Sequence, residues 1–162
     1  MTTITQVIND GQVTISDDNA NSEILSCASG DFSYSALTPS GKATVAVDSR
    51  GSYCALREGE RVPVTGSFSL FAHDPNADFA KLANGTTAGT ISTSLAVGDL
   101  HCVDLEFDFS YGAETRKIIF DDCHLVEDGS EGNPSTTSYS FTAYGRVQKV
   151  NGSETTTPIT GL

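Results

Sequence analysis

The chain has 162 residues and a formal net charge of −12, from 21 acidic and 9 basic residues. Its length fits one domain with an independent core. The charge excludes a protein that wraps nucleic acid, because that requires Lys and Arg to displace counterions. No apolar run reaches the roughly 20 residues of a membrane span. Ser and Thr make up nearly a quarter of the chain and helix formers are scarce, which favours a mainly β domain.

The first half predicts short strands separated by turns. Val13 and Ile15 alternate with polar residues and indicate the first strand, and residues 29–42 are expected as a long loop. A hairpin follows, with strands at 44–47 and 53–57. The next strand alternates over 62–70, where Pro63 indicates an edge position and Gly66 a bulge or a close approach of another chain segment.

One short flanking helix is expected at about 75–83. Asp74 suits the N-cap, Pro75 the first turn and Gly85 the C-terminal stop. An apolar stripe follows helical spacing in this segment; its members are Phe79, Leu82 and Ala83. Such a short helix needs a sheet to pack against.

The clearest pattern is a hairpin at 102–123, in which Gly112-Ala113 forms a two-residue loop typical of a type II′ turn. The pairs expected from this loop are Leu105 with Phe120, Phe107 with Ile118, and Asp108 with Lys117. One face is then apolar and the other charged, as in a half-buried ribbon. The same register sets Asp104 opposite Asp121, an unfavourable pair that a bulge would relieve.

The last expected strand runs from 139 to 147, after an acidic loop at 127–138. The chain therefore predicts one antiparallel β-sandwich or barrel domain over 1–150. Residues 151–162 are expected as a flexible C-terminal arm without a pairing partner.

No signal peptide is recognisable at the N-terminus, so the cysteines are expected as thiols of a cytoplasmic protein; they are Cys27, Cys54, Cys102 and Cys123. His101-Cys102 and Cys123-His124 mirror each other across the hairpin and match a zinc set by count. Neighbouring strand residues point to opposite faces, however, which would separate the Cys pair from the His pair. We therefore expect no zinc site, with Cys102 facing Cys123.

Other chemical motifs are incomplete. The segment from Asp74 resembles the start of a calcium loop, but Phe79 replaces the required Gly and Gly85 the final Glu. The chain has three His but no nucleophile elbow around a Ser. We expect no catalytic residue, no metal and no cofactor.

Three acids alternate strictly along the 102–123 hairpin: Asp104, Glu106 and Asp108. Such a row is most simply a solvated face. It would also suit the lining of a passage that must not hold nucleic acid, because aligned carboxylates repel a polyanion.

The order of these parts resembles the tail tube (major tail) proteins of long-tailed bacteriophages. The resemblance covers roughly residues 10–150 and includes the VTGSFSLF strand at 64–71, the short helix, the hairpin and the closing strand at 138–147. It implies a virion structural protein, not an enzyme, that is assembled in the host cytoplasm. Its subunits would form rings, commonly hexamers, that stack into a tube with other tail proteins.

DNA would pass through this tube without stable binding, and we expect Asp104, Glu106 and Asp108 to face the lumen. Another virion β-protein, such as a tail terminator or a capsid decoration protein, fits the same composition. A ligand-binding β-sandwich module fits less well, because the chain lacks Trp for a sugar platform. No membrane partner is expected, since the acidic chain is repelled from anionic lipid.

Overall fold

The protein is described from a computed structural model, which covers residues 11–17, 21–26, 32–35, 37, 41–49, 52–71, 79, 82–83, 85, 100–111, 114–130, 136–152 and 154–159. The strands within these ranges are β1 (Gln12–Ser16), β2 (Ser22–Ser26), β3 (Ser33–Tyr34), β4 (Lys42–Ser49), β5 (Ser52–Arg61), β6 (Val64–Phe71), β7 (Val103–Tyr111), β8 (Glu114–Ser130), β9 (Thr136–Ala143), β10 (Val147–Asn151) and β11 (Glu154–Ile159). The protein is mainly β, and every strand pairing is antiparallel, as the composition predicts.

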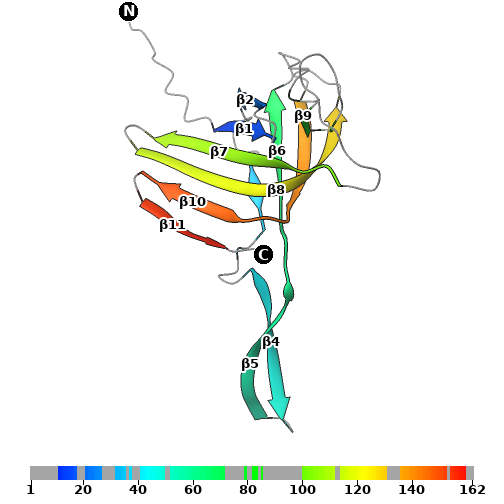
Figure 1. The fold of residues 1–162 in the computed structure, drawn as a ribbon, viewed down its shortest axis with the longest axis vertical. Helices are drawn as coiled ribbons and strands as arrows, with labels where there is room; N and C mark the ends of the chain where they lie inside the picture. The colour runs from blue at the N-terminus through cyan, green and yellow to red at the C-terminus, as the bar shows by residue number, and fades with distance from the viewer. Residues whose placement is uncertain are drawn as a thin grey trace, which may run out of the picture.

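Nine strands form one sheet in the order β2-β1-β7-β8-β9-β6-β3, with β10 and β11 continuing from the first half of β8 (Figure 1). The sheet curls on itself, so that β2 near one end contacts β6 near the other. This gives a sandwich-like body. Among the described strands, β4 and β5 pair with each other alone, and they project away from the body (Figure 1); we call this element the β4–β5 hairpin.

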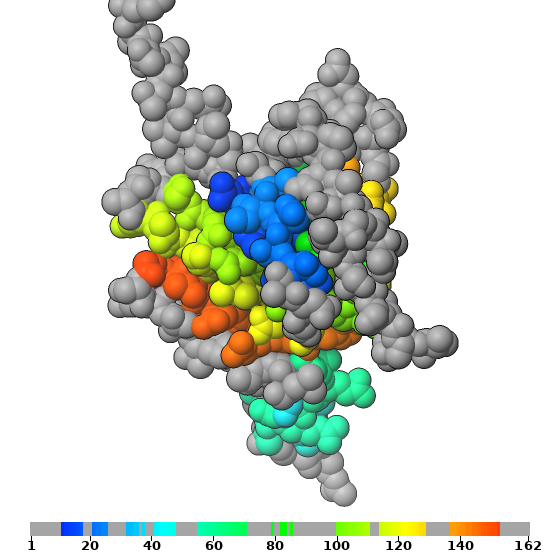
Figure 2. Space-filling model, turned by 45° about the horizontal axis from the view of Figure 1, so that its top comes forward, coloured from blue at the N-terminus to red at the C-terminus, as the bar shows by residue number. Residues whose placement is uncertain are grey.

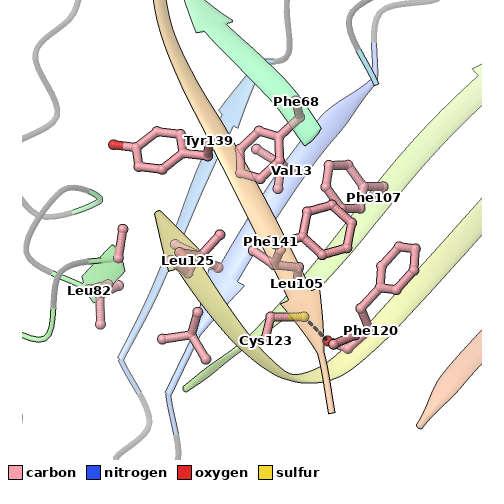
Figure 3. Packing of buried hydrophobic residues seen from close by; sticks show 14 of the residues in the cluster. Val13, Phe68, Leu82, Leu105, Phe107, Phe120, Cys123, Leu125, Tyr139 and Phe141 are labelled. Carbon is pink, nitrogen blue, oxygen red and sulfur yellow. Dashed lines mark hydrogen bonds between the residues drawn. The ribbon is translucent and has the colours of Figure 1, made fainter. Parts of the chain in front are cut away.

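The core lies inside the curled sheet and is rich in aromatic rings (Figure 3). Phe107 is fully buried, and its ring centroid lies 5.3 Å from that of Phe68 and 5.9 Å from that of Phe120. Phe32, in the segment before β3, stacks on Phe107, and the two ring centroids are 4.0 Å apart. That segment, expected as part of a loop, therefore covers the core, because its aromatic side chains have apolar surface to bury.

Strand β8 bends sharply at Asp121 and Asp122. Its first half pairs with β10 and its second half with β9, while β7 runs along the other edge. Asp122 has a φ of 54°, which places it in the left-handed region that L-residues seldom adopt. Gly145 N donates to Asp121 O at 3.0 Å, and Asp121 N donates to Arg146 O at 2.8 Å. We call the residues Asp121, Asp122, Tyr144, Gly145 and Arg146 the β8 corner.

The 102–123 hairpin has the predicted register. Leu105 pairs with Phe120 and Asp108 with Lys117, and the two-residue connection joins the paired Tyr111 and Glu114. A register shift between Val103 and Leu105 confirms the bulge expected at the Asp104–Asp121 pair.

The expected helix at about 75–83 is not confirmed, because no helix can be delimited within the described residues. Most of that stretch lies outside them. The described members, Phe79, Leu82 and Ala83, have helical backbone and are buried against the core. The helical spacing of these apolar residues therefore correctly indicates that they are buried, independently of where the element begins and ends.

The prediction of two irregular segments is wrong in part, because strands occupy some of their residues. Residues 154–159 of the predicted C-terminal arm form β11, which pairs with β10. The predicted loop at 127–138 is shorter, because β8 continues to Ser130 and β9 begins at Thr136. In both cases a neighbouring strand supplies hydrogen-bond partners for a polar sequence without an apolar pattern of its own.

Candidate functional site

The acidic row of β7 lies on the outer face of the sheet. Val103, Leu105 and Phe107 are buried at 3%, 0% and 0% exposure, and the acids between them are partly exposed. This confirms the inside–outside alternation predicted for the strand. No contact in the structure bears on whether this face lines a channel, so the lumen assignment of Asp104, Glu106 and Asp108 stays a prediction.

Two of the three acids share one cation from β8. Lys117 Nζ lies 2.5 Å from Glu106 Oε1 and 3.2 Å from Asp108 Oδ1. Hydrogen bonds to Glu106 and then Asp108 raise the pKa of Lys117. The repulsive field of this face is therefore weaker than three free carboxylates would give.

The third acid, Asp104, stabilises the β8 corner. Its Oδ1 accepts a hydrogen bond from Asp122 N at 3.0 Å, next to the left-handed Asp122 backbone. Arg146 Nε donates to Asp121 Oδ2 at 2.9 Å within the same corner. A Cβ on Gly145 would lie 2.6 Å from Asp121 O, so only glycine fits at this crossing. Asp104 is thus a structural residue as well as a surface charge.

The Cys–His constellation does not assemble into a metal site. The bulge at Asp104 sets Cys123 opposite Val103, so the expected facing of Cys123 and Cys102 is wrong. Both are free thiols, and burial, followed by nearby Asp carboxylates, raises the pKa of each. Among the described residues, no group of three or more His, Cys, Asp or Glu could hold an ion.

The two described histidines contact backbone carbonyls. His101 Nε2 lies 2.6 Å from Leu82 O, and His124 Nδ1 lies 3.1 Å from His101 O. These contacts link Leu82, through His101 just before β7, to His124 in β8. The third histidine, His73, lies outside the described residues, as does Cys27. The oxygen-bearing side chains that begin the calcium-like segment, Asp74, Asn76 and Asp78, also lie outside them.

The described side chains of the β4–β5 hairpin are mostly exposed, and the hairpin projects below the body in a space-filling view (Figure 2). At its base, Val62 N donates to Gly41 O at 2.9 Å, and the Arg61 guanidinium donates to Tyr144 O in the β8 corner. Lys42 Nζ lies 2.7 Å from Glu58 Oε2 along the hairpin. Beyond its base the hairpin pairs with no other strand among the described residues.

Apolar side chains on this hairpin are open to solvent. Leu56 is 60% exposed and Val47 39% exposed. Sequence alternation identified both strands but not their separation from the core, because each strand of a free hairpin has the same period as a core strand.

A shallow hollow at the hairpin base has mostly apolar walls and room for about one water-sized sphere. Its lining includes Val62, Pro63, Ala143 and Val147. Ligand pockets usually measure roughly 300–1,000 Å³, so a hollow with room for about one water molecule does not fit a small-molecule site.

Comparison of the chain with protein-family models and with curated proteins gives no match. Within the described part of the chain, no helix has the length and apolar character needed to cross a membrane.

Proposed function

We propose that this chain is a structural virion protein that self-assembles into stacked rings, the tail tube of a long-tailed phage, through which DNA passes. The observation that carries the proposal is the β4–β5 hairpin. Its strands of 8 and 10 residues extend about 30 Å at the usual rise per residue, and they leave the body rather than cover it (Figure 1).

In an isolated monomer such a hairpin would have little to stabilise it. A two-stranded ribbon is marginally stable in water, and here it also exposes Leu56 and Val47. Unpaired strand edges are a liability unless they are covered. Contact with another subunit would bury the apolar side chains and satisfy the edges, which is what an assembly protein gains from a projecting arm.

The acidic outer face of β7 fits the same proposal. Glu106 and Asp108 outnumber Lys117, which lies between them. A ring would repeat this surplus of negative charge around a channel. Lumenal carboxylates would keep the duplex from binding to the wall.

Negative-stain microscopy of the concentrated protein tests the proposal, with a variant whose residues 44–58 are replaced by a short Gly-Ser turn as the matched control. We expect tubes or stacked rings from the parent and unstacked particles from the control. Rings that never stack would favour a tail terminator. Small monodisperse particles at every concentration would contradict self-assembly and leave a decoration protein or a binding module.

A further inference from the structure

Two asparagines of this chain are followed directly by glycine, Asn84 and Asn151. Asparagine is one of the chemically labile residues, and it reacts most readily before glycine, which has no side chain to shield the reacting atoms. Asn84 lies outside the described residues. Asn151 is the last residue of β10 and is exposed, so water reaches it.

The reaction at such a pair is an intramolecular substitution followed by hydrolysis. The backbone nitrogen of the glycine loses its proton and attacks the side-chain carbonyl carbon of the asparagine. The new C–N bond closes a cyclic imide, and the side-chain amide takes up a proton and leaves as ammonia. Water then opens the ring at either carbonyl. One opening gives aspartate, and the other gives isoaspartate, in which the main chain runs through the side-chain carbons.

The fold leaves this asparagine open but withholds the attacking nitrogen. Gly152 N donates a hydrogen bond to Thr115 O of β8 at 2.8 Å, and the nitrogen must lose this bond before it can attack. Nothing lies within 4 Å of a Cβ built on Gly152, so crowding adds no protection. Asn151 itself is paired with Arg116 of β8 and with Glu154 of β11, which keeps its backbone in the strand.

We propose that Asn151 is a deamidation site whose rate is set by the opening of the β10 end from β8. The bond from Gly152 N lies at the end of a strand, where local opening costs least. Closing it should slow the reaction about fivefold to tenfold, the factor expected from one net backbone hydrogen bond. The reaction needs one chain and water, and it does not depend on the proposed self-assembly.

The two products differ in what they do to the fold. Aspartate keeps the normal main chain, and its charge stands in register between Glu154 and Arg116, a repulsion and an attraction that offset each other. Isoaspartate adds a methylene to the main chain, which displaces Gly152 N and removes its bond to Thr115 O. Isoaspartate therefore loosens the β10–β11 ribbon where it leaves β8.

Peptide mass spectrometry measures the reaction in the folded protein and in the urea-unfolded protein in the same mildly alkaline buffer. In the unfolded chain Asn84 and Asn151 should react alike, because both precede glycine, and this calibrates the measurement. In the folded protein Asn151 should react steadily, but about fivefold to tenfold more slowly. Equal rates for Asn151 in the two states would overturn the proposal, since the bond to Thr115 O would then withhold nothing.

Thr115→Gly tests whether opening at this strand end controls the rate. The variant retains the accepting carbonyl but weakens the exposed end of β8, because glycine favours strands least. Asn151 should then react about threefold faster in the folded protein. Thr44→Gly, also an exposed position but on the β4–β5 hairpin, is the matched control and should leave the rate unchanged. Circular dichroism should show that both variants fold.

Hydrogen exchange at Gly152 N in the parent protein measures the same opening directly, and its protection should match the slowing of the reaction. If Thr115→Gly reacts at the parental rate, opening at this strand end does not control the reaction. If Asn151 stays unmodified in the folded protein until the unfolded chain has converted fully, the reaction requires global unfolding. Either result would show that the proposal is wrong.

Discussion

Asp104 offers the sharpest test of how the acidic face relates to the fold. It lies on the same face of β7 as Glu106, and a surface map would treat the two alike. Asp104 Oδ1, however, accepts a hydrogen bond from the backbone of Asp122 at 3.0 Å, where the chain adopts a φ of 54°. Glu106 only shares Lys117 with Asp108.

Asp104→Ala should destabilise the protein by about 1.5 kcal/mol, the lower end for a hydrogen bond to a charged group, because the site is partly open to water. For a chain of this length that corresponds to a fall in Tm of about 3–6 °C. Glu106→Ala should cost only about 0.5 kcal/mol, as exposed ion pairs do. Asp104→Asn retains an acceptor oxygen, so its loss of unfolding free energy should lie between those of Asp104→Ala and Glu106→Ala.

Urea unfolding followed by circular dichroism measures these differences, since the chain has no Trp for fluorescence. If Asp104→Ala and Glu106→Ala have equal free energies of unfolding, the Asp104 hydrogen bond does not stabilise the β8 corner. A test of the lumen proposal should accordingly neutralise Glu106 and Asp108 and leave Asp104 intact, because replacing all three acids by Lys would alter stability together with charge.

Two further predictions concern crowding and pH. Gly66→Ala should destabilise by about 1–3 kcal/mol in urea unfolding, because the added Cβ would lie 2.5 Å from Ser33 O and against the Phe141 ring; an unchanged midpoint would refute this tight contact. Burial, and then Glu127, raise the pKa of Tyr139 to about 12 from 10.0. The folded state thus holds this proton more tightly, and stability should fall as pH rises from about 10 to about 12. Tyr139→Phe should flatten that fall, and an identical pH profile in the variant would contradict it.

The close approach at Gly66 illustrates what local sequence can indicate. A glycine inside an alternating strand predicts a bulge or a near neighbour, and the second alternative is confirmed. The identity of the neighbours, Ser33 and Phe141, came only from the structure. They lie far away in the sequence, and no local pattern specifies which segment crosses a given strand.

The sequence determined the 102–123 hairpin almost completely. A period of two separates inner from outer residues, and a two-residue loop sets the register, so Leu105 had to face Phe120. It even located the bulge, through the repulsion expected between Asp104 and Asp121. The register and the bulge depend only on residues that are neighbours within one hairpin, so the local sequence is enough to predict them.

Only the tertiary structure decided how far β8 extends, that residues 154–159 pair with β10, and that the β4–β5 hairpin leaves the body. The bend in β8 depends on Gly145 fitting against Asp121 and on Asp104 binding Asp122 N, contacts between separate strands. Apolar and polar residues alternate in the hairpin as they do in a core strand. The hairpin is left free because the other nine strands form the sheet without it. Periodicity records which side chains share a face, whereas long-range packing decides what that face meets.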